Sequence, residues 1–359
     1  MGIYEVIIFI IAIFAVLGGI DRIFDNRFQL AHQFQEGILA MGSLALAMVG
    51  IICLAPVVAS ILRPIVVPLY SFLGADAAMF AGTLLACDMG AGSLAMEMTS
   101  DPQAAMLGGV LTGSMLGATI VFTIPVALGI IDPGDRPALA KGVLCGIITI
   151  PLGILVGGLT AGFPIGMIAR NLIPIILIAI LISLGLWRAE SAMIKGFTVF
   201  GKGVSIVITI GLIAAIFEHL TGRVIIPGMT PISEGFETVG AIAVVLAGAF
   251  PLMYVITKAL NAPLLRLGNA LGINDTAAAG MVTSLANSIA TFGMLKDMDE
   301  RGKIVNIAFA VSAAFVLGDH MGFAAGFAPE MLLPMILGKL TGGIGAVAVA
   351  LLLTRKYGD

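Results

Sequence analysis

The chain has 359 residues, of which 59% are hydrophobic and 11% are charged. Soluble domains average about 25% charged residues, so this composition is typical of a protein that lies in a membrane. The formal net charge is −3 without any basic run, and this balance argues against a nucleic-acid partner.

Apolar stretches long enough to cross a bilayer recur along the whole chain. A helix of about 20 residues spans roughly 30 Å of hydrocarbon. The stretches are residues 3–20, 37–60, 105–130, 138–161, 171–187, 203–219, 235–258, 304–327 and 333–353. The first begins with Glu5 rather than a basic residue and lacks a small-residue cleavage pattern, so we expect a retained helix, not a signal peptide. The sequence predicts an all-α polytopic membrane protein.

The two halves of the chain resemble each other. At an offset of 198 residues, segment 36–82 matches segment 234–280 with 13 identities in 47 positions. Further along, LGATIVF (116–122) aligns with LGDHMGF (317–323). We therefore predict two membrane repeats and a helix that joins them. Their expected bounds are 1–161 for the first repeat, 162–200 for the connecting helix and 201–359 for the second repeat.

Each copy contains one helix-length segment that is interrupted at its centre. FAGTLLACDMGAGSLAMEM (80–98) is broken by DMGAG (88–92), and AAGMVTSLANSIATFGML (278–295) is broken by NS (287–288). Such a segment either spans the membrane or returns to its own side as a re-entrant hairpin. Irregular backbone at this depth is tolerated only where it packs within protein or lines a cavity.

The distribution of Lys and Arg distinguishes these two topologies, because short cytoplasmic loops carry the excess of positive charge. Two hairpins leave nine crossings and divide the basic residues 14 to 4, whereas two further spans give eleven crossings and a division of 9 to 9. The larger group is Arg22, Arg27, Arg136, Lys141, Arg188, Lys195, Lys202, Lys258, Arg266, Lys296, Arg301, Lys303, Arg355 and Lys356; the smaller is Arg63, Arg170, Arg223 and Lys339. We predict inverted repeats with about nine full crossings plus two re-entrant hairpins, the N-terminus outside and the C-terminus inside.

Asp88 lies at the tip of the first predicted hairpin. It could cap the helix that follows, as turn carboxylates do, or it could hold a cation at membrane depth. Asn287 falls at the matching place in the second copy, with Ser288 and Thr291 close by. These three side chains offer neutral hydrogen-bond donors and acceptors.

Asp319 and His320 stand side by side within the apolar run 304–327. An aspartate at the centre of a bilayer costs roughly 2.5–3.5 kcal/mol, so such residues usually face a partner, a cavity or a substrate. The two residues could satisfy each other or an unseen basic partner, or they could line a site beside the hairpin tips. Their counterpart in the first copy is Ala118-Thr119, and Thr119 adds another candidate hydroxyl.

The cysteines and the glycine-rich segments do not indicate a cofactor. Cys53, Cys87 and Cys145 lie in apolar segments and form no CxxC pair, so we expect packing residues rather than a disulfide or zinc framework. GGVLTGSMLG (108–117) and GKLTGGIG (338–345) suit close helix packing, and neither is a phosphate loop. We expect no catalytic residue, no cofactor and no metal site.

Two carboxylates, an amide, hydroxyls and a histidine, with little aromatic lining, suit a small hydrophilic cation. A carboxylate forms a charge-assisted hydrogen bond with an ammonium, and a hydroxyl or amide can bind a neutral end. A quaternary cation would call for an aromatic cage instead. Opposed broken elements in inverted repeats point to the substrate site of a transporter.

Several stretches of the chain resemble the ethanolamine utilisation transporters of the EutH type. They are EGILAMGSLALAMVG (36–50), FAGTLLACDMG (80–90), TIVFTIPVALGII (119–131), MDERGKIVNIAFAVSAAFVLGDHMGFAA (298–325) and PMILGKL (334–340). The resemblance implies uptake of ethanolamine, chiefly as its ammonium form, across the bacterial cytoplasmic membrane. It also implies that the amine feeds a catabolic pathway with a coenzyme-B12-dependent lyase. It does not assign the binding residues.

Other functions stay open at this point. A cation channel of the ammonium type would use the same carboxylates in a continuous pore, and a symporter would couple a small amine to H⁺ or Na⁺. An intramembrane enzyme could use Asp319 and His320 as acid and base, but no Ser or Cys nucleophile shares their segment. We expect a transporter and not an enzyme. Its expected partners are ethanolamine and membrane lipid, and homo-oligomerisation is left open.

Overall fold

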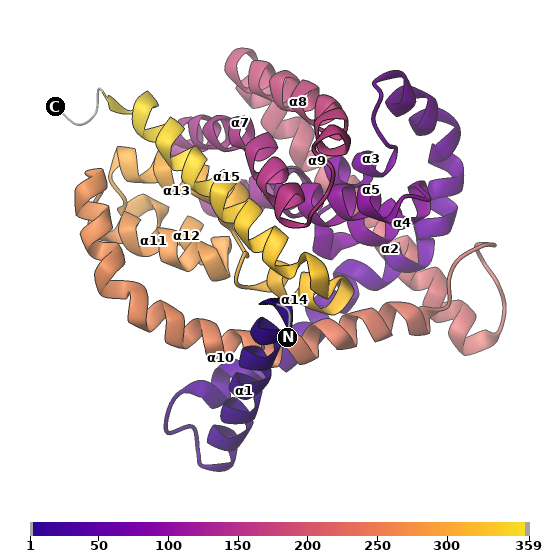
Figure 1. The fold of residues 1–359 in the computed structure, drawn as a ribbon, viewed down its shortest axis with the longest axis horizontal. Coiled ribbons are helices and arrows are strands. Elements are labelled where there is room, and N and C mark those ends of the chain that lie inside the picture. The colour runs from indigo at the N-terminus through magenta and orange to yellow at the C-terminus, as the bar shows by residue number, and fades with distance from the viewer. Residues whose placement is uncertain (1–2, 356–359) are drawn as a thin grey trace.

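The structure, a computed structural model, describes residues 3–355, and every regular element within them is helical (Figure 1). The longer helices are α1 (Ile3–Ile23), α2 (Leu30–Phe72), α7 (Arg136–Thr160), α8 (Ile165–Arg188), α9 (Glu190–Thr221), α10 (Ile232–Leu271) and α15 (Leu332–Leu353). The shorter helices are α3 (Ala78–Leu84), α4 (Ala91–Met98), α5 (Pro102–Met106), α6 (Ile124–Ile130), α11 (Asp275–Ala286), α12 (Ser288–Gly293), α13 (Glu300–Ala313) and α14 (Asp319–Phe327). Two π-helical segments, η2 (Leu107–Gly117) and η3 (Thr119–Thr123), continue α5 towards α6, and 3₁₀ turns occupy η1 (Cys87–Met89), η4 (Pro133–Asp135), η5 (Leu295–Asp297) and η6 (Pro329–Met331).

Eight helical segments of the described chain are long and apolar enough to cross a membrane. They are Tyr4–Ile23, Leu30–Phe72, Pro102–Ile130, Pro133–Thr160, Ile165–Arg188, Glu190–Thr221, Ile232–Ala259 and Pro329–Leu353. The prediction of an all-α polytopic membrane protein is confirmed. Lys356, which was counted among the basic residues, lies outside the described residues.

The ninth predicted crossing, 304–327, is wrong as a continuous helix. An irregular segment, 314–318, separates α13 from α14. In this segment the backbone N–H groups of Phe315 and Leu317 donate to the carbonyl oxygens of residues 284–285, at 3.0 and 2.9 Å. These bonds tie the segment to the end of α11, so the backbone leaves the helical path.

The long helices α2 and α10 each exceed what a bilayer needs. Their 43 and 40 residues correspond to about 65 and 60 Å at 1.5 Å per residue. The stretches 63–74 and 261–272, which follow the membrane-length parts, do not form separate helices. They continue α2 as far as Phe72 and α10 as far as Leu271.

A proline within α2 provides an anchor for the loop before α10. Pro56 has no N–H, so the carbonyl oxygen of Ile52 lacks its usual intrahelical donor. The Thr230 hydroxyl donates to that oxygen at 3.2 Å, and the Thr230 N–H donates to the carbonyl oxygen of Cys53 at 3.0 Å. The entry to α10 is thereby fixed against the middle of α2.

α2 and α10 touch at two places, and the two contacts are equivalent when the residues of one half are replaced by their repeat counterparts in the other. A methyl group placed on Gly37 would lie 2.5 Å from the backbone of Ala247, and one on Gly235 would lie 2.9 Å from the Val49 side chain. Gly235 and Ala247 stand 198 residues after Gly37 and Val49, which is the offset of the repeat. The two helices therefore pack antiparallel through a reciprocal contact of the kind that two-fold related units make.

The helices α1 and α9 show the same reciprocal arrangement. A Cβ on Gly248 of α10 would collide with the carbonyl oxygen of Ile11 in α1, and one on Gly50 of α2 would collide with that of Ile208 in α9. α1 has 21 residues, and the segment 198 positions later, 201–221, is the second part of α9. Each outer helix thus packs on the long helix of the other half. The direction of each half across a membrane stays a prediction.

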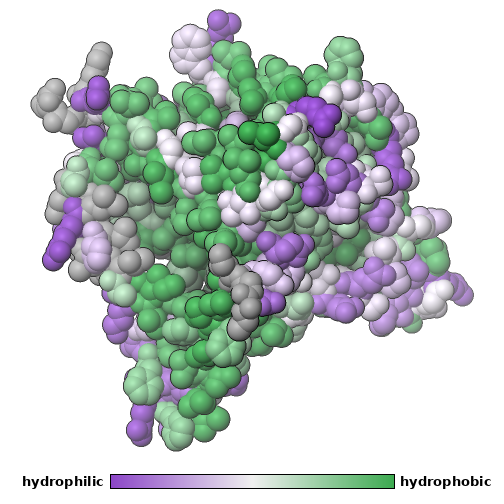
Figure 2. Space-filling model, in the orientation of Figure 1, coloured by the Kyte–Doolittle hydropathy of each residue, from purple (hydrophilic) through white to green (hydrophobic). Residues whose placement is uncertain are grey.

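Apolar side chains cover much of the molecular surface. Figure 2 shows them over the projection formed by α1 and the beginning of α2, whereas hydrophilic side chains gather mainly over the right-hand part of this face. Residues of α1 such as Phe9, Val16 and Leu17 are exposed. This distribution is expected for helices that face lipid.

Candidate functional site

The first interrupted segment places Asp88 on a short 3₁₀ turn. This turn, η1, lies between α3 and α4, and Gly90 follows it with a φ of +90°. A Cβ at Gly90 would also collide with the Ile51 side chain. Because glycine satisfies both the positive φ and the close approach, the backbone can turn here and hold the Asp88 carboxylate at the break.

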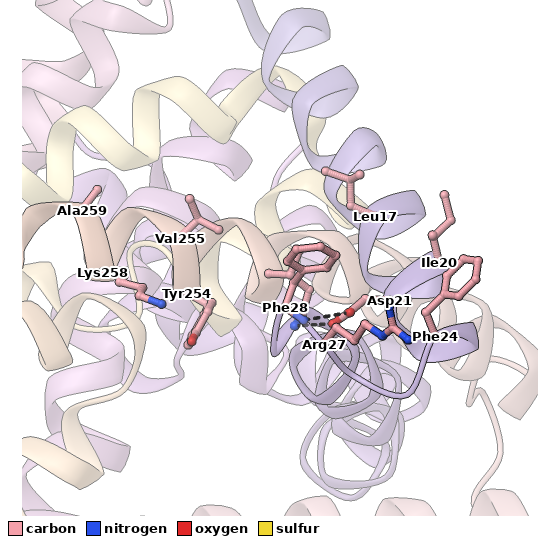
Figure 3. Close-up of a pocket in the computed structure, with 11 residues that line it drawn as sticks. Leu17, Ile20, Asp21, Phe24, Arg27, Phe28, Tyr254, Val255, Lys258 and Ala259 are labelled. Atoms are coloured by element: carbon pink, nitrogen blue, oxygen red, sulfur yellow. Dashed lines mark hydrogen bonds between the residues drawn. The ribbon is translucent and has the colours of Figure 1, made fainter.

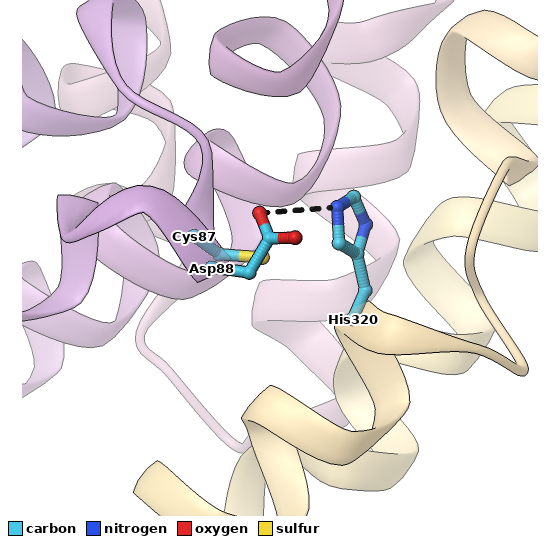
Figure 4. Close-up of side chains that lie close together, drawn as sticks. All are labelled: Cys87, Asp88 and His320. Carbon is cyan, nitrogen blue, oxygen red and sulfur yellow. Dashed lines mark ion pairs between the residues drawn. The ribbon is translucent and has the colours of Figure 1, made fainter. Parts of the chain in front are cut away.

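Asp88 faces a histidine from the other half of the chain. His320 Nε2 lies 3.6 Å from Asp88 Oδ1, and the two side chains point towards each other in Figure 4. The side chain of Asp88 is 20% exposed and that of His320 is 3% exposed. His320 Nδ1 is buried without a hydrogen-bond partner among the described residues. One ring nitrogen is therefore engaged, and the other is available to a ligand.

Asp319 adds a second carboxylate beside this pair. Its side chain is half-buried at the first turn of α14 and makes no hydrogen bond or ion pair within the described part of the chain. Asp319 and Asp88 are close enough for their negative charges to interact. Two like charges in a poorly solvated interior repel each other, so this arrangement favours a cation near both carboxylates.

Aromatic rings lie closer to the site than the sequence led us to expect. The Phe315 ring lies 5.3 Å from the His320 ring and 5.5 Å from the Phe122 ring, measured between centroids. The expectation of little aromatic lining is corrected for this side of His320. Phe315 packs against the imidazole and helps to fix its orientation, and Phe122 packs in turn against Phe315.

Lys339 is a member of this cluster that the sequence analysis missed. It is only 1% exposed, and its Nζ donates to the carbonyl oxygen of Ser114 at 2.5 Å. Ser114 is preceded by Gly113, where a Cβ would lie 3.1 Å from the backbone N of Cys87, so Lys339 belongs to the same interior region as Asp88. Counting Lys339 with the basic residues of the outer side was wrong, because it lies in the interior. Its place inside the apolar helix 333–353 was the available signal.

Thr119 lies in the interior but its hydroxyl is already used. The Oγ1 atom lies 2.7 Å from the carbonyl oxygen of Met115 and 3.0 Å from that of Val311. A hydroxyl has one proton to donate, so its lone pairs alone remain for a ligand. This contact joins the π-helical segment η3 to α13.

The second interrupted segment is broken at Asn287, as the sequence predicted. Asn287 is exposed, and its Oδ1 accepts a hydrogen bond from the Ile289 N–H at the start of α12. The Thr291 hydroxyl donates to the carbonyl oxygen of Gly280 and accepts from Ser284. The hydroxyl of Ser288, by contrast, is buried without a partner among the described residues. Of these three candidates, Ser288 has the hydroxyl that is available to a ligand.

The irregular segment 314–318 brings both interrupted elements to one place. A Cβ on Gly318 would collide with the carbonyl oxygen of Ala286 at the end of α11, and the next residues in the chain are Asp319 and His320. His320 in turn faces Asp88. The structure therefore groups Asp88, Asp319, His320 and Lys339, and it connects them to the second break through Gly318.

Cys87 gives the cluster a set of side chains that could hold a metal ion. Ligand atoms of Cys87, Asp88 and His320 lie within 4.8 Å of one another. The buried ammonium of Lys339 interacts with the same groups and opposes a divalent cation there. Cys87, Asp88 and His320 therefore suit a singly charged cationic ligand better than a divalent metal ion.

A sequence model of one protein family, described as "Ethanolamine utilisation protein, EutH", matches residues 3–353. The chain belongs to this EutH family. It is 63% identical over 356 residues to "Probable ethanolamine permease EutH" of Listeria monocytogenes, which covers 99% of this chain and 95% of that protein. The resemblance identified in the sequence is confirmed.

Two other relatives match over nearly the full length. The identity is 52% with "Uncharacterized protein YxeR" of Bacillus subtilis, covering 99% of this chain and 96% of that protein. It is 46% with "Probable ethanolamine permease EutH" of Salmonella typhimurium, covering 99% and 97%. No solved structure matches the chain.

The EutH-family chain also has a pocket of about 730 Å³ on its surface, between α1 and α10 (Figure 3). Its lining includes Arg27 and Lys258, and Lys258 lies over the Tyr254 ring at 5.7 Å from the centroid. Asp21 also lines it, but its carboxylate accepts three backbone N–H groups at the start of α2. None of the predicted site residues lines this pocket, so it is separate from the cluster around Asp88.

Proposed function

We propose that the chain transports ethanolamine, chiefly in its ammonium form, across the cytoplasmic membrane of a bacterium. The names of the Listeria and Salmonella relatives support the substrate, and the eight apolar segments support the membrane location. The neutral amine can cross lipid unaided. A facilitator is therefore most useful in acid, where almost none of the amine is neutral.

In this proposal the ammonium group binds between Asp88 and Asp319. The observation that carries it is the contact of the partly buried Asp88 with His320, which directly follows a second carboxylate, Asp319, without a partner in the described chain. An ammonium forms charge-assisted hydrogen bonds with carboxylates. His320 Nδ1 and Ser288 Oγ, both buried and unpaired, are the groups that we assign to the hydroxyl end, with Asn287, Thr291 and Thr119 around them.

We further propose that the two halves, 1–161 and 201–359, are inverted repeats joined by 162–200. The reciprocal antiparallel packing of α2 and α10 supports this proposal, as do the broken elements at Asp88 and Asn287. Opposed broken elements that carry a site between inverted repeats are typical of secondary transporters, and movement of one bundle against the other gives access from each side in turn.

The decisive experiment is uptake of labelled ethanolamine into sealed proteoliposomes at acidic and alkaline external pH, with and without an imposed proton gradient. We expect saturable uptake at acidic pH without the gradient, which is facilitated diffusion of the ammonium form. Uptake that requires the gradient would indicate proton coupling and would make Asp319 and His320 the proton site to test. A lack of uptake under every condition would overturn ethanolamine as the substrate.

A further inference from the structure

We infer that Lys339 acts as a tethered counter-ion. Its ammonium neutralises Asp88 while the carrier is empty, and the ammonium of the substrate replaces it beside Asp88 on binding. The inference rests on the proposed function and concerns the step in which the carrier returns without cargo. Lys339 carries the same chemical group as the substrate, a primary ammonium, on a stem of four carbons.

The surroundings of Lys339 leave its charge incompletely satisfied. An ammonium has three N–H donors, and the only hydrogen bond of Lys339 within the described residues is the one to Ser114. No carboxylate of the described chain lies within ion-pair contact of its Nζ. Ser114 follows Gly113, however, where an added Cβ would lie 3.1 Å from the backbone N of Cys87, the residue next to Asp88. The structure therefore holds the lysine beside the site, with two donors left for another partner.

The helix that carries Lys339 is held firmly, so the side chain is the part that can move. A methyl group on Gly338 would lie 2.7 Å from the carbonyl oxygen of Gly153, and the reverse contact has the same distance. Such close approach fixes α15 against α7. The flexible stem of Lys339 then lets its ammonium exchange the Ser114 carbonyl for another partner without any shift of the helix.

The need for a counter-ion follows from the cost of a buried charge. A carboxylate without a partner in a poorly solvated interior is strongly unfavourable. With substrate bound, the ammonium of ethanolamine neutralises Asp88. Without substrate, His320 can compensate that charge only while its imidazole is protonated. With a neutral imidazole, the empty carrier would have to change its facing side with the charge of Asp88 uncompensated, unless Lys339 takes the place of the substrate.

Two transport modes in proteoliposomes separate this role from a structural one. Net uptake into vesicles without internal ethanolamine requires the empty carrier to return, whereas counterflow against unlabelled internal ethanolamine lets it return loaded. For Lys339→Met we expect net uptake to fall at least about tenfold further than counterflow, as the loss of one buried counter-ion implies. Equal losses in both modes, or no loss in either, would overturn the inference.

Lys303→Met is the matched control. Lys303 is also largely buried, but it donates to Asp135 at 2.8 Å and to Glu300 at 2.9 Å, away from the cluster. We expect any loss in this variant to be equal in the two modes. If the wild-type protein performs neither mode with ethanolamine, the proposed function fails, and this result is distinct from a failure of the role of Lys339.

A stability measurement covers the case in which Lys339→Met folds poorly. Removing one member of a buried pair is more damaging than removing both. We therefore expect Lys339→Met to lower the melting temperature in detergent and Asp88→Asn to restore part of the loss when the two are combined. Additive losses in the double variant would overturn the pairing of Lys339 with Asp88.

Discussion

His320 Nε2 lies 3.6 Å from Asp88 Oδ1, although the two residues are 232 positions apart in the chain. Asp88 belongs to the break in the first half, and His320 belongs to the first turn of α14 in the second half. The pair therefore connects the two halves at the point where the helices are interrupted. A ligand that binds between these two side chains would contact groups from both halves.

Asp88→Asn tests the carboxylate in the proposed ammonium site. Loss of a buried charge partner costs about 2–5 kcal/mol, and each 1.4 kcal/mol is tenfold, so we expect uptake at acidic pH to fall about 30-fold or more. The measurement is the initial rate of labelled ethanolamine uptake at limiting substrate. Asp132→Asn, at an exposed position, should leave the rate close to that of wild type. Near-normal uptake by Asp88→Asn would contradict the assignment.

Ser288→Ala and Thr291→Val separate ligand binding from structural hydrogen bonding. The Ser288 hydroxyl has no partner among the described residues. Its removal should therefore raise the KM for ethanolamine about fivefold, the value of one hydrogen bond of about 1 kcal/mol, with no loss of stability. The Thr291 hydroxyl is bonded to Ser284 and Gly280, so its removal should lower the free energy of unfolding by about 1–3 kcal/mol. An unchanged KM in Ser288→Ala would place the hydroxyl end of the substrate elsewhere.

Gly318→Ala tests the link between the second break and α14. The added methyl group would collide with the carbonyl oxygen of Ala286, so we expect a loss of stability of about 1–3 kcal/mol and a loss of transport. Gly240→Ala is the matched control, because a Cβ there meets nothing within 4 Å. In the middle of α10 this change should stabilise the protein by about 0.5–1 kcal/mol. The melting temperatures of the two variants are compared by thermal unfolding in detergent. Equal values would mean that the contact between Gly318 and Ala286 is loosely packed.

Cysteine labelling tests the inverted orientation of the repeats. Ser100 and Asp297 are exposed and lie just after the two interrupted segments, one in each half. A maleimide that cannot cross membranes should label Ser100→Cys in intact cells and Asp297→Cys only after permeabilisation. The native cysteines Cys53, Cys87 and Cys145 are all buried, so the background should be low. Labelling of both variants from one side would contradict inversion.

The sequence was informative where the chain's own residues determine the local backbone. The glycines of DMGAG (88–92) and the polar pair NS (287–288) predicted the two breaks, and both are present. The break at 314–318 was missed because no Gly or Pro precedes Gly318 in AAFVLG. It is produced by hydrogen bonds to residues 284–285, which sequence patterns along one helix do not report.

In the candidate site, too, the residues marked by their local sequence were predicted and the one determined by a distant contact was not. Asp88, Asp319 and His320 were found because charged groups within apolar segments are conspicuous. Lys339 was counted with the basic residues of the outer side, although it lies within the last apolar stretch, and its burial depends on Ser114, which is 225 positions away. Its place in an apolar stretch was a signal of burial, but the local pattern does not show which distant segment encloses it.

The reciprocal contacts of Gly37 with Ala247 and of Gly235 with Val49 have an energetic consequence. If the two halves trade conformations, these contacts are rebuilt with the partners interchanged, and their sum changes little. The balance between the two arrangements then depends on the positions where the halves differ, such as Asp88 against Asn287 and His320 against Thr119. Substitutions there would tilt the resting protein towards one face of the membrane, while substitutions at the shared glycines would weaken both arrangements alike.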